Sequence, residues 1–478
     1  MRDFGLYIDG EWRDATGGEW FEAIDPSTGE AVAKVALGTP EDVELAVRSS
    51  AAAAREWQAL APRDRAAALR RMADALVEEI DDLAMLETLD AGGTLSYSEI
   101  TVRDIAARRF EYFAGLADKL EGEQLPIRHG YHVYSMREPL GVTAHIVPWN
   151  GPLWEASRSL APALAAGNAA ILKPAQEALL GAIRLGEIAK RAGFPDGLVN
   201  VIPGPGSTVG EAMVAHSGIS GITFTGSVPV GQRILERSAA TLKRVVLELG
   251  GNAANIVFPD ADLDAAVEGS VYAAFSNAGQ ICVAGPRILV HESVRTEFTE
   301  RLIEKVQRLS IGPGMENHDL TPVVSERHMY RVLEMIEVGR REGARLLTGG
   351  HRVTDAGLAN GYYVAPTVFD QVTPEMRVSR EEIFGPVATI TGFKSEDEAV
   401  ALANDTEYGL ANGLWTHDLS TAHRVAARLE SGQVYVNEWF CGDISCPAGG
   451  YKLSGIGREE GQQAVNNYLQ LKTVRIRV

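Results

Sequence analysis

The chain has 478 residues, which is too long for one hydrophobic core, so we expect two or three domains. Hydrophobic residues make up 45% and charged residues 23%, a balance typical of a soluble globular protein. The net charge of −19 argues against a nucleic-acid surface, which would need a basic patch. No stretch is apolar for long enough to span a bilayer, so no membrane association is predicted.

The cysteine count and the first residues favour a cytoplasmic protein. The start, "MRDFGLYIDGEW", lacks a basic segment followed by an apolar run, so it predicts no signal peptide. Cysteines stand only at positions 282, 441 and 446, which makes a poor disulfide framework and fits no common zinc site. We therefore expect a reducing compartment and no metal.

The N-terminal third predicts a hairpin followed by helices. In "LYIDGEW" the pair Asp9-Gly10 stands between apolar runs, which is a turn signal. A helical pattern starts at Thr39, which can cap the helix, and Pro40 takes the first helical position. The helical region is expected to run to about residue 90, with a break near residue 61, and to stop at "DAGGT" (90–94).

Residues 141–251 predict a parallel sheet. The short apolar runs "GVTAHIV", "NAAILK", "LVNVIP", "GITFTG" and "RVVLEL" alternate with helical segments, a rhythm typical of βαβ units covered on both faces. A second α/β region begins with "NAANIVF" and continues to about residue 436. The last segment, "YLQLKTVRIRV", alternates like a strand and could pair elsewhere in the chain or with a second subunit.

Ligands bind at the carboxyl ends of parallel strands, so polar residues there are candidates for a site. Asn150 follows the first run in "HIVPWNGP", and it either projects an amide or merely caps a helix. Lys173 ends the next run in "ILKPAQE", and it could reach a ribose or phosphate or be a solvated charge.

Two glycine-rich turns also follow strands. In "FTGSVPVG" (224–231), Gly226 allows close backbone approach, and Ser227 with the free N–H groups of the next helix favours an anion. "PGPGSTVG" (203–210) is a second such turn, and neither matches the G-x-G-x-x-G fingerprint of dinucleotide sites.

Two motifs contain carboxylates: one lies in an apolar strand, where burying a charge is costly, and the other precedes a turn. Glu248 lies in the apolar strand "LELGGN", where it is either a general base with a raised pKa or a salt-bridged glutamate at a strand end. In "EEIFGPV" (381–387), two carboxylates precede a Phe-Gly-Pro turn or lie in a solvated loop.

The residues next to Cys282 in the sequence do not decide its chemical role. In "NAGQICVAGPR" it is surrounded by small residues, so it is either a buried structural thiol or a nucleophile activated from elsewhere in the chain.

These motifs together resemble the aldehyde dehydrogenase superfamily, in its NAD(P)-dependent, hydrolytic type that does not acylate coenzyme A. The joint pattern is "PWN", "LKP", "FTGS", "LELGG", "GQICVAG", "EEIFGP", "NDTEYGLANGLWT" and "GGYKLSGIGRE", and the resemblance covers nearly the whole chain. It implies an α/β fold with a Rossmann-type NAD(P)-binding domain (1–120 and 140–250) and an α/β catalytic domain (251–450). A small β bridging arm (121–139 and 460–478) would add strands across a subunit interface, so a homodimer or homotetramer is expected.

The resemblance implies covalent catalysis in two halves. The Cys282 thiolate attacks an aldehyde to form a thiohemiacetal, whose oxyanion is held by the Asn150 amide and the Cys282 backbone N–H. Hydride transfer to the nicotinamide gives a thioester, and Glu248 activates the water that hydrolyses it. The relatives that use coenzyme A usually lack this base, so Glu248 favours release of a carboxylic acid.

The resemblance also assigns cofactor contacts. Lys173 should reach the adenine-side ribose, Ser227 the pyrophosphate, and Glu382 the nicotinamide-side ribose, with Phe384 beside the nicotinamide. Gln176 stands where the family often has a glutamate that repels a 2′-phosphate, so NAD is expected and NADP is possible. The remaining cofactor-binding residues expected are Val147, Pro148, Trp149, Gly206, Gly226 and Leu249.

The substrate channel departs from the family pattern. Gly151, Ser276 and Ala448 replace residues that are often aromatic, which predicts a wider channel. Glu155 and Arg158 stand three apart on the helix after Asn150, so they share a face and could pair. Arg158 could instead receive a substrate carboxylate, so the substrate is expected to be a bulky, polar or carboxylate-bearing aldehyde.

A further departure concerns a charge pair of the family. Ser159 stands where a lysine often follows on this helix, although the family partner of that lysine, Glu459, is kept. A proton relay built on that pair is therefore in doubt.

Two other functions remain as alternatives. A cysteine-dependent ester or thioester hydrolase would need a histidine near Cys282, and no histidine lies in a recognisable motif. A non-catalytic family member would be expected to lose either the thiol or the base, and both are present.

Overall fold

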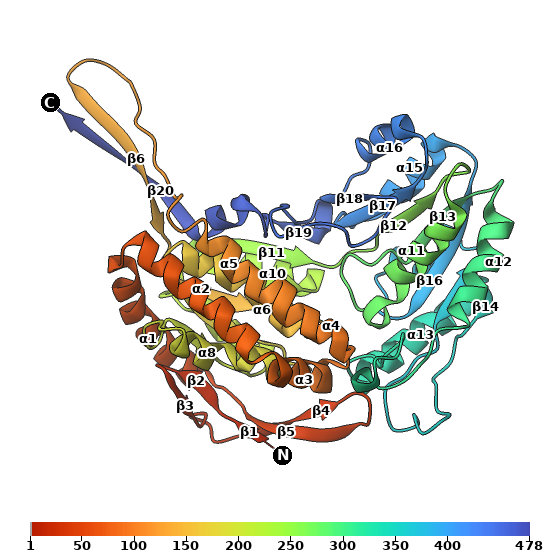
Figure 1. The fold of residues 1–478 in the computed structure, drawn as a ribbon, viewed down its shortest axis with the longest axis horizontal. Coiled ribbons are helices and arrows are strands. Elements are labelled where there is room, and N and C mark those ends of the chain that lie inside the picture. Colours follow the sequence, from red (N-terminus) through yellow and green to blue (C-terminus); the bar gives the residue numbers. More distant parts are fainter. Residues whose placement is uncertain (1) are drawn as a thin grey trace.

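Two mainly parallel sheets and a long two-stranded ribbon organise the chain in the computed structural model, which describes residues 2–478 (Figure 1). The expected α/β fold class is confirmed. Among residues 2–478, no helix is long and apolar enough to cross a membrane.

The N-terminal hairpin is confirmed as β2 (Leu6–Ile8) and β3 (Glu11–Arg13), which pair antiparallel at the edge of the first sheet. Strands β1 (Arg2–Phe4), β4 (Trp20–Asp25) and β5 (Glu30–Ala36) form a separate small sheet.

The first long helices start where the sequence predicts. Helix α1 (Pro40–Ala59) is capped by Thr39, whose side chain and that of Asp42 form a reciprocal capping box. Helix α2 (Pro62–Glu78) begins after the predicted break, and α3 (Ile80–Ala91) ends at Gly92, whose φ of 81° is left-handed.

The helical region ends near residue 90 as predicted, at Gly92 of "DAGGT", and a further helix that was not predicted follows directly. Thr94 accepts a hydrogen bond from the backbone N–H of Tyr97 and so starts α4 (Leu95–Ile100). This helix continues as a π-helical stretch (Thr101–Ala107) and as α5 (Arg108–Ala114).

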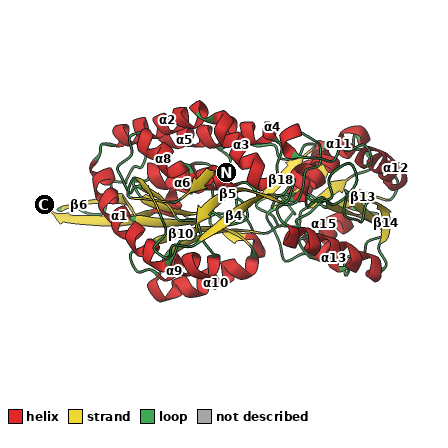
Figure 2. Cartoon of the chain, turned by 90° about the horizontal axis from the view of Figure 1, so that it is seen from below, coloured by secondary structure: helices red, strands yellow, loops and turns green. Residues whose placement is uncertain are grey.

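The first sheet has eight strands in the order β19-β11-β10-β7-β8-β9-β2-β3. All five predicted runs are strands, and they pair parallel to one another. Helices cover both faces (Figure 2), and each face has its own apolar core. The strands are β7 (Val142–Ile146), β8 (Ala169–Lys173), β9 (Val199–Val201), β10 (Gly221–Gly226), β11 (Arg244–Leu249) and β19 (Gly455–Ile456), and the helices are α6 (Pro152–Ala165), α7 (Leu180–Ile183), α8 (Leu185–Arg191), α9 (Glu211–Ala215) and α10 (Val228–Ser238).

The second sheet has seven strands in the order β14-β15-β16-β13-β12-β17-β18. It begins with "NAANIVF" and ends at Val436, as predicted. The strands are β12 (Ala254–Val257), β13 (Arg287–His291), β14 (Arg345–Thr348), β15 (Thr367–Asp370), β16 (Val387–Phe393), β17 (Ala411–Trp415) and β18 (Gln433–Val436), and the helices are α11 (Leu263–Phe275), α12 (Arg295–Val306), α13 (Glu326–Glu342), α14 (Arg377–Arg380), α15 (Glu396–Asn404) and α16 (Leu419–Ala426).

The C-terminal segment is a strand, and its partner lies within the same chain. Strand β20 (Leu469–Arg477) pairs antiparallel along its whole length with β6 (Tyr131–Pro139). The ribbon projects far from the body (Figure 1), and Leu471 and Ile476 expose apolar surface along it.

Candidate functional site

The predicted oxyanion donor and the cysteine loop meet between the two sheets. Asn150 Nδ2 donates to the backbone carbonyl of Gln280 at 3.0 Å, and Asn277 Nδ2 donates to the carbonyl of Asn150 at 3.2 Å. The N-cap of α6 is Gly151, so the alternative that Asn150 merely caps the helix was wrong. The two hydrogen bonds fix the amide beside the segment that carries Cys282.

The loop before Cys282 has an unusual backbone. Asn277 and Ala278 have φ values of 49° and 54°, and Gly279 follows with 73°, so three successive residues are left-handed. Gln280 Oε1 accepts from the N–H of Val324 at 2.9 Å, which ties the loop to the second domain's wall. Such strain persists only where the surroundings hold it, and here the hydrogen bonds of Asn277 and Gln280 hold the loop that precedes Cys282.

Cys282 is half-buried and free. Burial raises the pKa of its thiol to about 12; the charge of Glu155 adds to the shift and Arg158 opposes it. The largest influences on this pKa include no histidine, which the hydrolase alternative would need. The thiol therefore needs a nearby proton acceptor before it can attack.

Glu248 lies on β11 and is only 4% exposed. Among the described residues, no donor lies within hydrogen-bond distance of its Oε1. Burial raises the pKa of its carboxyl well above the usual range, and Arg158 partly offsets this. This side chain is not the salt-bridged glutamate of the alternative interpretation, and an unpartnered carboxyl beside a thiol is suited to proton transfer.

Arg158 connects three elements around this carboxyl. Its Nη2 lies 2.5 Å from Glu155 Oε2, as the helix spacing predicts, and 3.2 Å from Thr225 Oγ1 on β10. Its Nε also pairs with Glu459. The family pattern pairs this glutamate with a lysine at the position of Ser159, and here Arg158 is its cationic partner instead. The proton relay built on a lysine at Ser159 is therefore absent in that form, since Ser159 Oγ is aimed at backbone carbonyls of its own helix.

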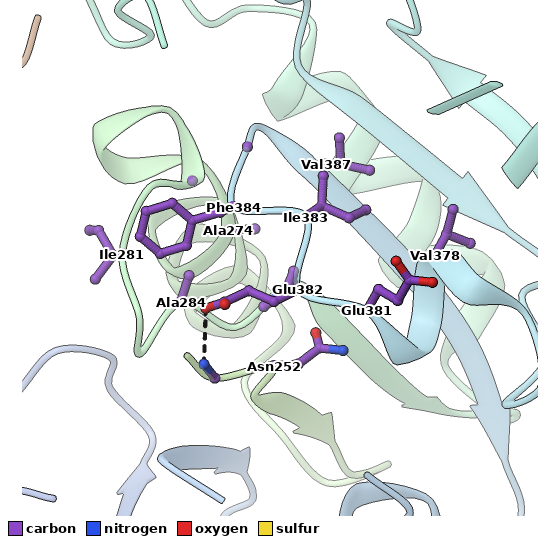
Figure 3. A pocket seen from close by; sticks show the side chains of 14 residues that line it. Asn252, Ala274, Ile281, Ala284, Val378, Glu381, Glu382, Ile383, Phe384 and Val387 are labelled. Carbon is purple, nitrogen blue, oxygen red and sulfur yellow. Dashed lines mark hydrogen bonds between the residues drawn. The ribbon is translucent and has the colours of Figure 1, made fainter. Parts of the chain in front are cut away.

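Glu382 is one of the residues that line the pocket drawn in Figure 3. Its Oε1 accepts from the backbone N–H of Gly251 at 2.9 Å, and burial raises its pKa to about 7. A Cβ on Gly250 would lie 2.1 Å from Glu382 Oε2, so any larger residue there would have to displace this carboxylate. Glu382 is thus held at the pocket wall, while the alternative that this motif is a solvated loop fits only Glu381, which pairs with Arg377 at the surface.

Phe384 and Trp149 form one edge of the same region. Their ring centroids are 5.3 Å apart and nearly perpendicular, and His328 contacts both rings. His328 Nε2 also lies 2.7 Å from the backbone oxygen of Phe384, whose φ is +58°. His328 has no signal in the sequence, because it acts on a residue 56 positions away.

Lys173 is buried rather than solvated. It is 4% exposed, its Nζ donates to the carbonyl of Pro174, and burial lowers its pKa to about 8. Gly210, in the second glycine-rich turn, would place a Cβ 3.8 Å from the Lys173 stem, so the end of this turn packs against Lys173; Gly206, earlier in the same turn, has open space around it. Gln176 is half-buried close by, next to Glu177, which pairs with Arg327.

The turn of Gly226 and Ser227 leads into α10. Ser227 is the exposed N-cap, and its side chain makes no capping bond, so the hydroxyl and the first N–H groups of the helix remain available to an anion. Leu249 has a structural place, because its side chain packs against Gly231 of α10. Val147 is buried and donates its N–H to the carbonyl of Lys173, and Pro148 is half-buried beside it.

The three small residues expected in the channel are half-buried. Ala448 exchanges backbone hydrogen bonds with Glu459, which brings it to the Arg158 cluster. Gly151 and Ser276 flank Asn150 and the cysteine loop, respectively.

Two aromatic pairs on and near α6 and α11 were missed from the sequence. Trp154 on α6 stacks with Tyr97 at 6.5 Å between ring centroids, and Tyr272 meets Phe440 edge-on at 5.3 Å. Burial raises the pKa of Tyr97, and Tyr272 and Glu155 add to the shift, which indicates that these side chains are neighbours. Position 272, one helical turn before Ser276, was the available signal.

Comparisons with known proteins agree with this geometry. The model of the aldehyde dehydrogenase family matches residues 12–474. A Burkholderia cenocepacia protein assigned as an aldehyde dehydrogenase is 43% identical, with a TM-score of 0.98 over 99% of this chain and 97% of that chain. Betaine aldehyde dehydrogenase from Staphylococcus aureus, solved with NAD+, is 38% identical, with a TM-score of 0.97 over 99% of this chain and 94% of that one.

A third structure, the NAD+ complex of aldehyde dehydrogenase from Bacillus cereus, is 38% identical, with a TM-score of 0.97 over 100% of this chain and 97% of that one. With a family match over nearly its whole length and these structural neighbours, the chain belongs to the aldehyde dehydrogenase family.

Proposed function

We propose that Cys282, Glu248 and Asn150 carry out the oxidation of an aldehyde to a carboxylic acid in this protein. As a member of its family, the chain is an aldehyde dehydrogenase that uses NAD. The observation that supports the residue roles is the convergence of a free thiol, an unpartnered buried carboxyl and a tethered amide between the two sheets.

In the first half, the Cys282 sulfur attacks the aldehyde carbon and loses its proton to a nearby base. Because burial raises the pKa of this thiol, proton removal at neutral pH requires an acceptor, and Glu248 is the base available in the same cluster. The Asn150 amide and the Cys282 N–H stabilise the oxyanion. The Asn150 amide now donates to Gln280, so it reaches the oxyanion by exchanging one acceptor for another.

The residues of the cofactor region fit NAD. Lys173 is a buried ammonium that donates to the backbone carbonyl of Pro174. Glu382 lies beside Gly250 and Gly251, which permit close approach, and α10 offers free N–H groups to a pyrophosphate. When bound there, NAD would supply the hydride acceptor for the oxidation. Phe384 and Trp149 provide an apolar wall that excludes water there. Neutral Gln176 adds no repulsion against a 2′-phosphate, so NADP remains a second cofactor to test.

In the second half, Glu248 takes a proton from a water molecule that attacks the thioester. Burial raises the pKa of this carboxyl, so its carboxylate form is a stronger base than an exposed one, which suits a general base. The products are a carboxylic acid and the free Cys282 thiol.

For the substrate, we propose a bulky or polar aldehyde without a carboxylate. Arg158 already pairs with two buried carboxylates, so it has little capacity for a third. The small residues at 151, 276 and 448 leave room, while Tyr97, Trp154 and Tyr272 offer aromatic contacts. The Staphylococcus aureus relative acts on betaine aldehyde, which adds a trimethylammonium aldehyde to the candidates.

Oligomer, domain division and compartment are also proposed. Exposed apolar side chains on the β6–β20 ribbon support its role as a bridging arm (121–139 and 460–478) in a homodimer or homotetramer. The two sheets support a cofactor domain of 1–120 and 140–250 and a catalytic domain of 251–450. A cytoplasmic location is supported by the three free cysteines.

The test is absorbance of the reduced nicotinamide, with NAD or NADP and a panel of aliphatic, aromatic, trimethylammonium and carboxylate-bearing aldehydes. Activity that disappears in Cys282→Ala supports the proposal, and the panel ranks the substrates. Ester cleavage without any cofactor-dependent oxidation would favour a cysteine hydrolase, and cofactor binding without either reaction would favour a non-catalytic protein.

A further inference from the structure

Two buried carboxylates near Glu248 share one cationic partner, Arg158. Glu155, Glu459 and Arg158 are 6%, 2% and 7% exposed, and they come from α6 and from the segment after β19. Arg158 pairs with both glutamates, so one guanidinium serves two carboxylates in a region where charge is poorly solvated.

The same guanidinium reaches the strand next to Glu248. Arg158 Nη2 donates to Thr225 Oγ1 at 3.2 Å, and Thr225 is the register partner of Glu248 on the adjacent parallel strand. Register partners on adjacent parallel strands point to the same face of a sheet, so Arg158 and the Glu248 side chain share that face.

The other side of Glu248 is built from the segment that Glu459 holds. A Cβ on Gly449 would lie 3.0 Å from Glu248 Oε1, and the neighbouring Ala448 exchanges two backbone hydrogen bonds with Glu459. Arg158 therefore links, through Glu459, the segment that covers Glu248 to the helix that follows Asn150.

We propose, resting on the function proposed above, that Arg158 is a positioning residue for Glu248. Through its contacts with Glu155, Glu459 and Thr225, it fixes the wall around the base and supplies the positive charge that keeps this base able to ionise for the second half of the reaction. Arg158 stands one position before Ser159 on α6 and serves as the cationic partner of Glu459. It is not a receptor for a substrate carboxylate.

The local electrostatics have the sign that this role needs. Arg158 lowers the pKa of Glu248, of Glu459 and of Cys282, while burial and the neighbouring carboxylates raise them. Removing Arg158 therefore raises the pKa of Glu248 and moves the pH at which it works upward. The charged and titratable groups that face this cluster are Glu155 and Arg158 on α6, Cys282 on its loop, Glu382 beyond it, Arg109 on α5, and Arg458, Glu459, Glu460 and Tyr468 from the C-terminal segment.

The two halves can be separated without a cofactor by using p-nitrophenyl acetate. Formation of the acyl-enzyme on Cys282 releases p-nitrophenolate as a burst, and the following linear phase reports hydrolysis of the thioester. We expect Arg158→Met to keep a burst near one equivalent per subunit, to slow the linear phase at pH 7 at least tenfold, and to shift its pH profile to higher pH.

Three further variants keep the test sharp. Arg158→Lys retains the charge and should recover part of the linear rate. The double variant Arg158→Met/Glu459→Gln removes one charge of each sign, so its pH profile should move back towards that of the wild type, and it remains informative if Arg158→Met does not fold. Arg184→Met is the matched control, because Arg184 is a comparably buried arginine that pairs with three carboxylates, Glu79, Asp82 and Glu187, none of which belongs to the proposed site; its linear phase and pH profile should not change.

Two results would overturn the proposal. One is a folded Arg158→Met protein whose linear rate and pH profile equal those of the wild type. The other is a rise in KM confined to carboxylate-bearing aldehydes, which would make Arg158 a substrate receptor. Failure of the proposed function is distinguishable, because the wild type would then show no Cys282-dependent reduction of NAD with any aldehyde.

Discussion

Glu87 on α3 is a buried carboxylate that should make stability depend on pH, and Glu87→Gln tests this. The side chain is 5% exposed, and its Oε1 accepts from the N–H of Leu153 at 3.1 Å, in the first turn of α6 just after Asn150. Burial raises the pKa of Glu87 from 4.5 to about 8, and the nearby charge of Asp90 adds to the shift. The glutamate is therefore protonated at pH 5 and is forced to ionise, in a buried place, as the pH rises.

The sign and size follow from proton linkage. Between pH 4.5 and about 8 the folded protein holds a proton on Glu87 that the unfolded chain releases, so stability is lost as pH rises through this window. One pKa unit corresponds to about 1.4 kcal/mol, which gives an upper bound of about 5 kcal/mol for this group. A glutamine keeps the acceptor for Leu153 and has no proton to lose, so it removes this loss.

Thermal unfolding at pH 5 and pH 8 measures the effect. At about 2.1 cal/mol/K of unfolding entropy per residue, a cooperative chain of this size changes its Tm by about 1 °C per kcal/mol. Glu87→Gln should match the wild type at pH 5 and exceed it by about 2–5 °C at pH 8. The control Glu78→Gln, at an exposed position of α2, should follow the wild type at both values. A Glu87→Gln protein that is equally or less stable than the wild type at pH 8 would refute the reasoning.

Two further predictions concern the site itself. Asn150→Ala removes one of two oxyanion donors, so kcat should fall about 10²- to 10³-fold while NAD binding, measured by fluorescence titration, stays unchanged; a fall of less than threefold would remove Asn150 from the oxyanion role. Gly250→Ala would place a methyl group 2.1 Å from Glu382 Oε2 and displace that carboxylate, so the Kd for NAD should rise about tenfold or more, whereas Gly343→Ala, a glycine with open space around it, should leave the Kd unchanged and only lower stability through its φ of 96°. Unaltered NAD binding in Gly250→Ala would contradict the contact assigned to Glu382.

The sequence predicted those parts of the fold that depend on local pattern. The five apolar runs between residues 141 and 251 became five parallel strands because each run is too short for a helix and is bounded by turn residues. Thr39 and Pro40 placed the start of α1 correctly. The stop near residue 90 was predicted correctly, at Gly92, but the new helix that Thr94 caps two residues later was missed, because its cap signal follows the stop signal so closely.

Site residues that lie in sequence motifs could be predicted, whereas contacts between distant elements could not. Asn150, Glu248 and Cys282 were recognised from the motifs that carry the family resemblance; Asn150 follows β7 and Glu248 lies near the end of β11, whereas Cys282 lies in a loop before β13. The partner of Arg158 on the C-terminal segment, Glu459, could not be derived from local spacing, because the two are 301 positions apart and meet only when β19 joins β11. His328 and Tyr97 were missed for the same reason, since their roles arise from contacts between elements.

The central claim is that Cys282 carries the acyl group and Glu248 releases it, and trapping that acyl group tests it most directly. Glu248→Gln should be mixed with NAD and a reactive aldehyde, and intact-mass and peptide mass spectrometry should follow within one turnover. The account predicts one reduced nicotinamide per subunit, formed more slowly than in the wild type because Glu248 also takes the thiol proton. It also predicts an acyl adduct on the peptide that contains Cys282, which persists in Glu248→Gln and turns over in the wild type. Full steady-state turnover in Glu248→Gln, or an adduct on Cys441 or Cys446 instead, would contradict it.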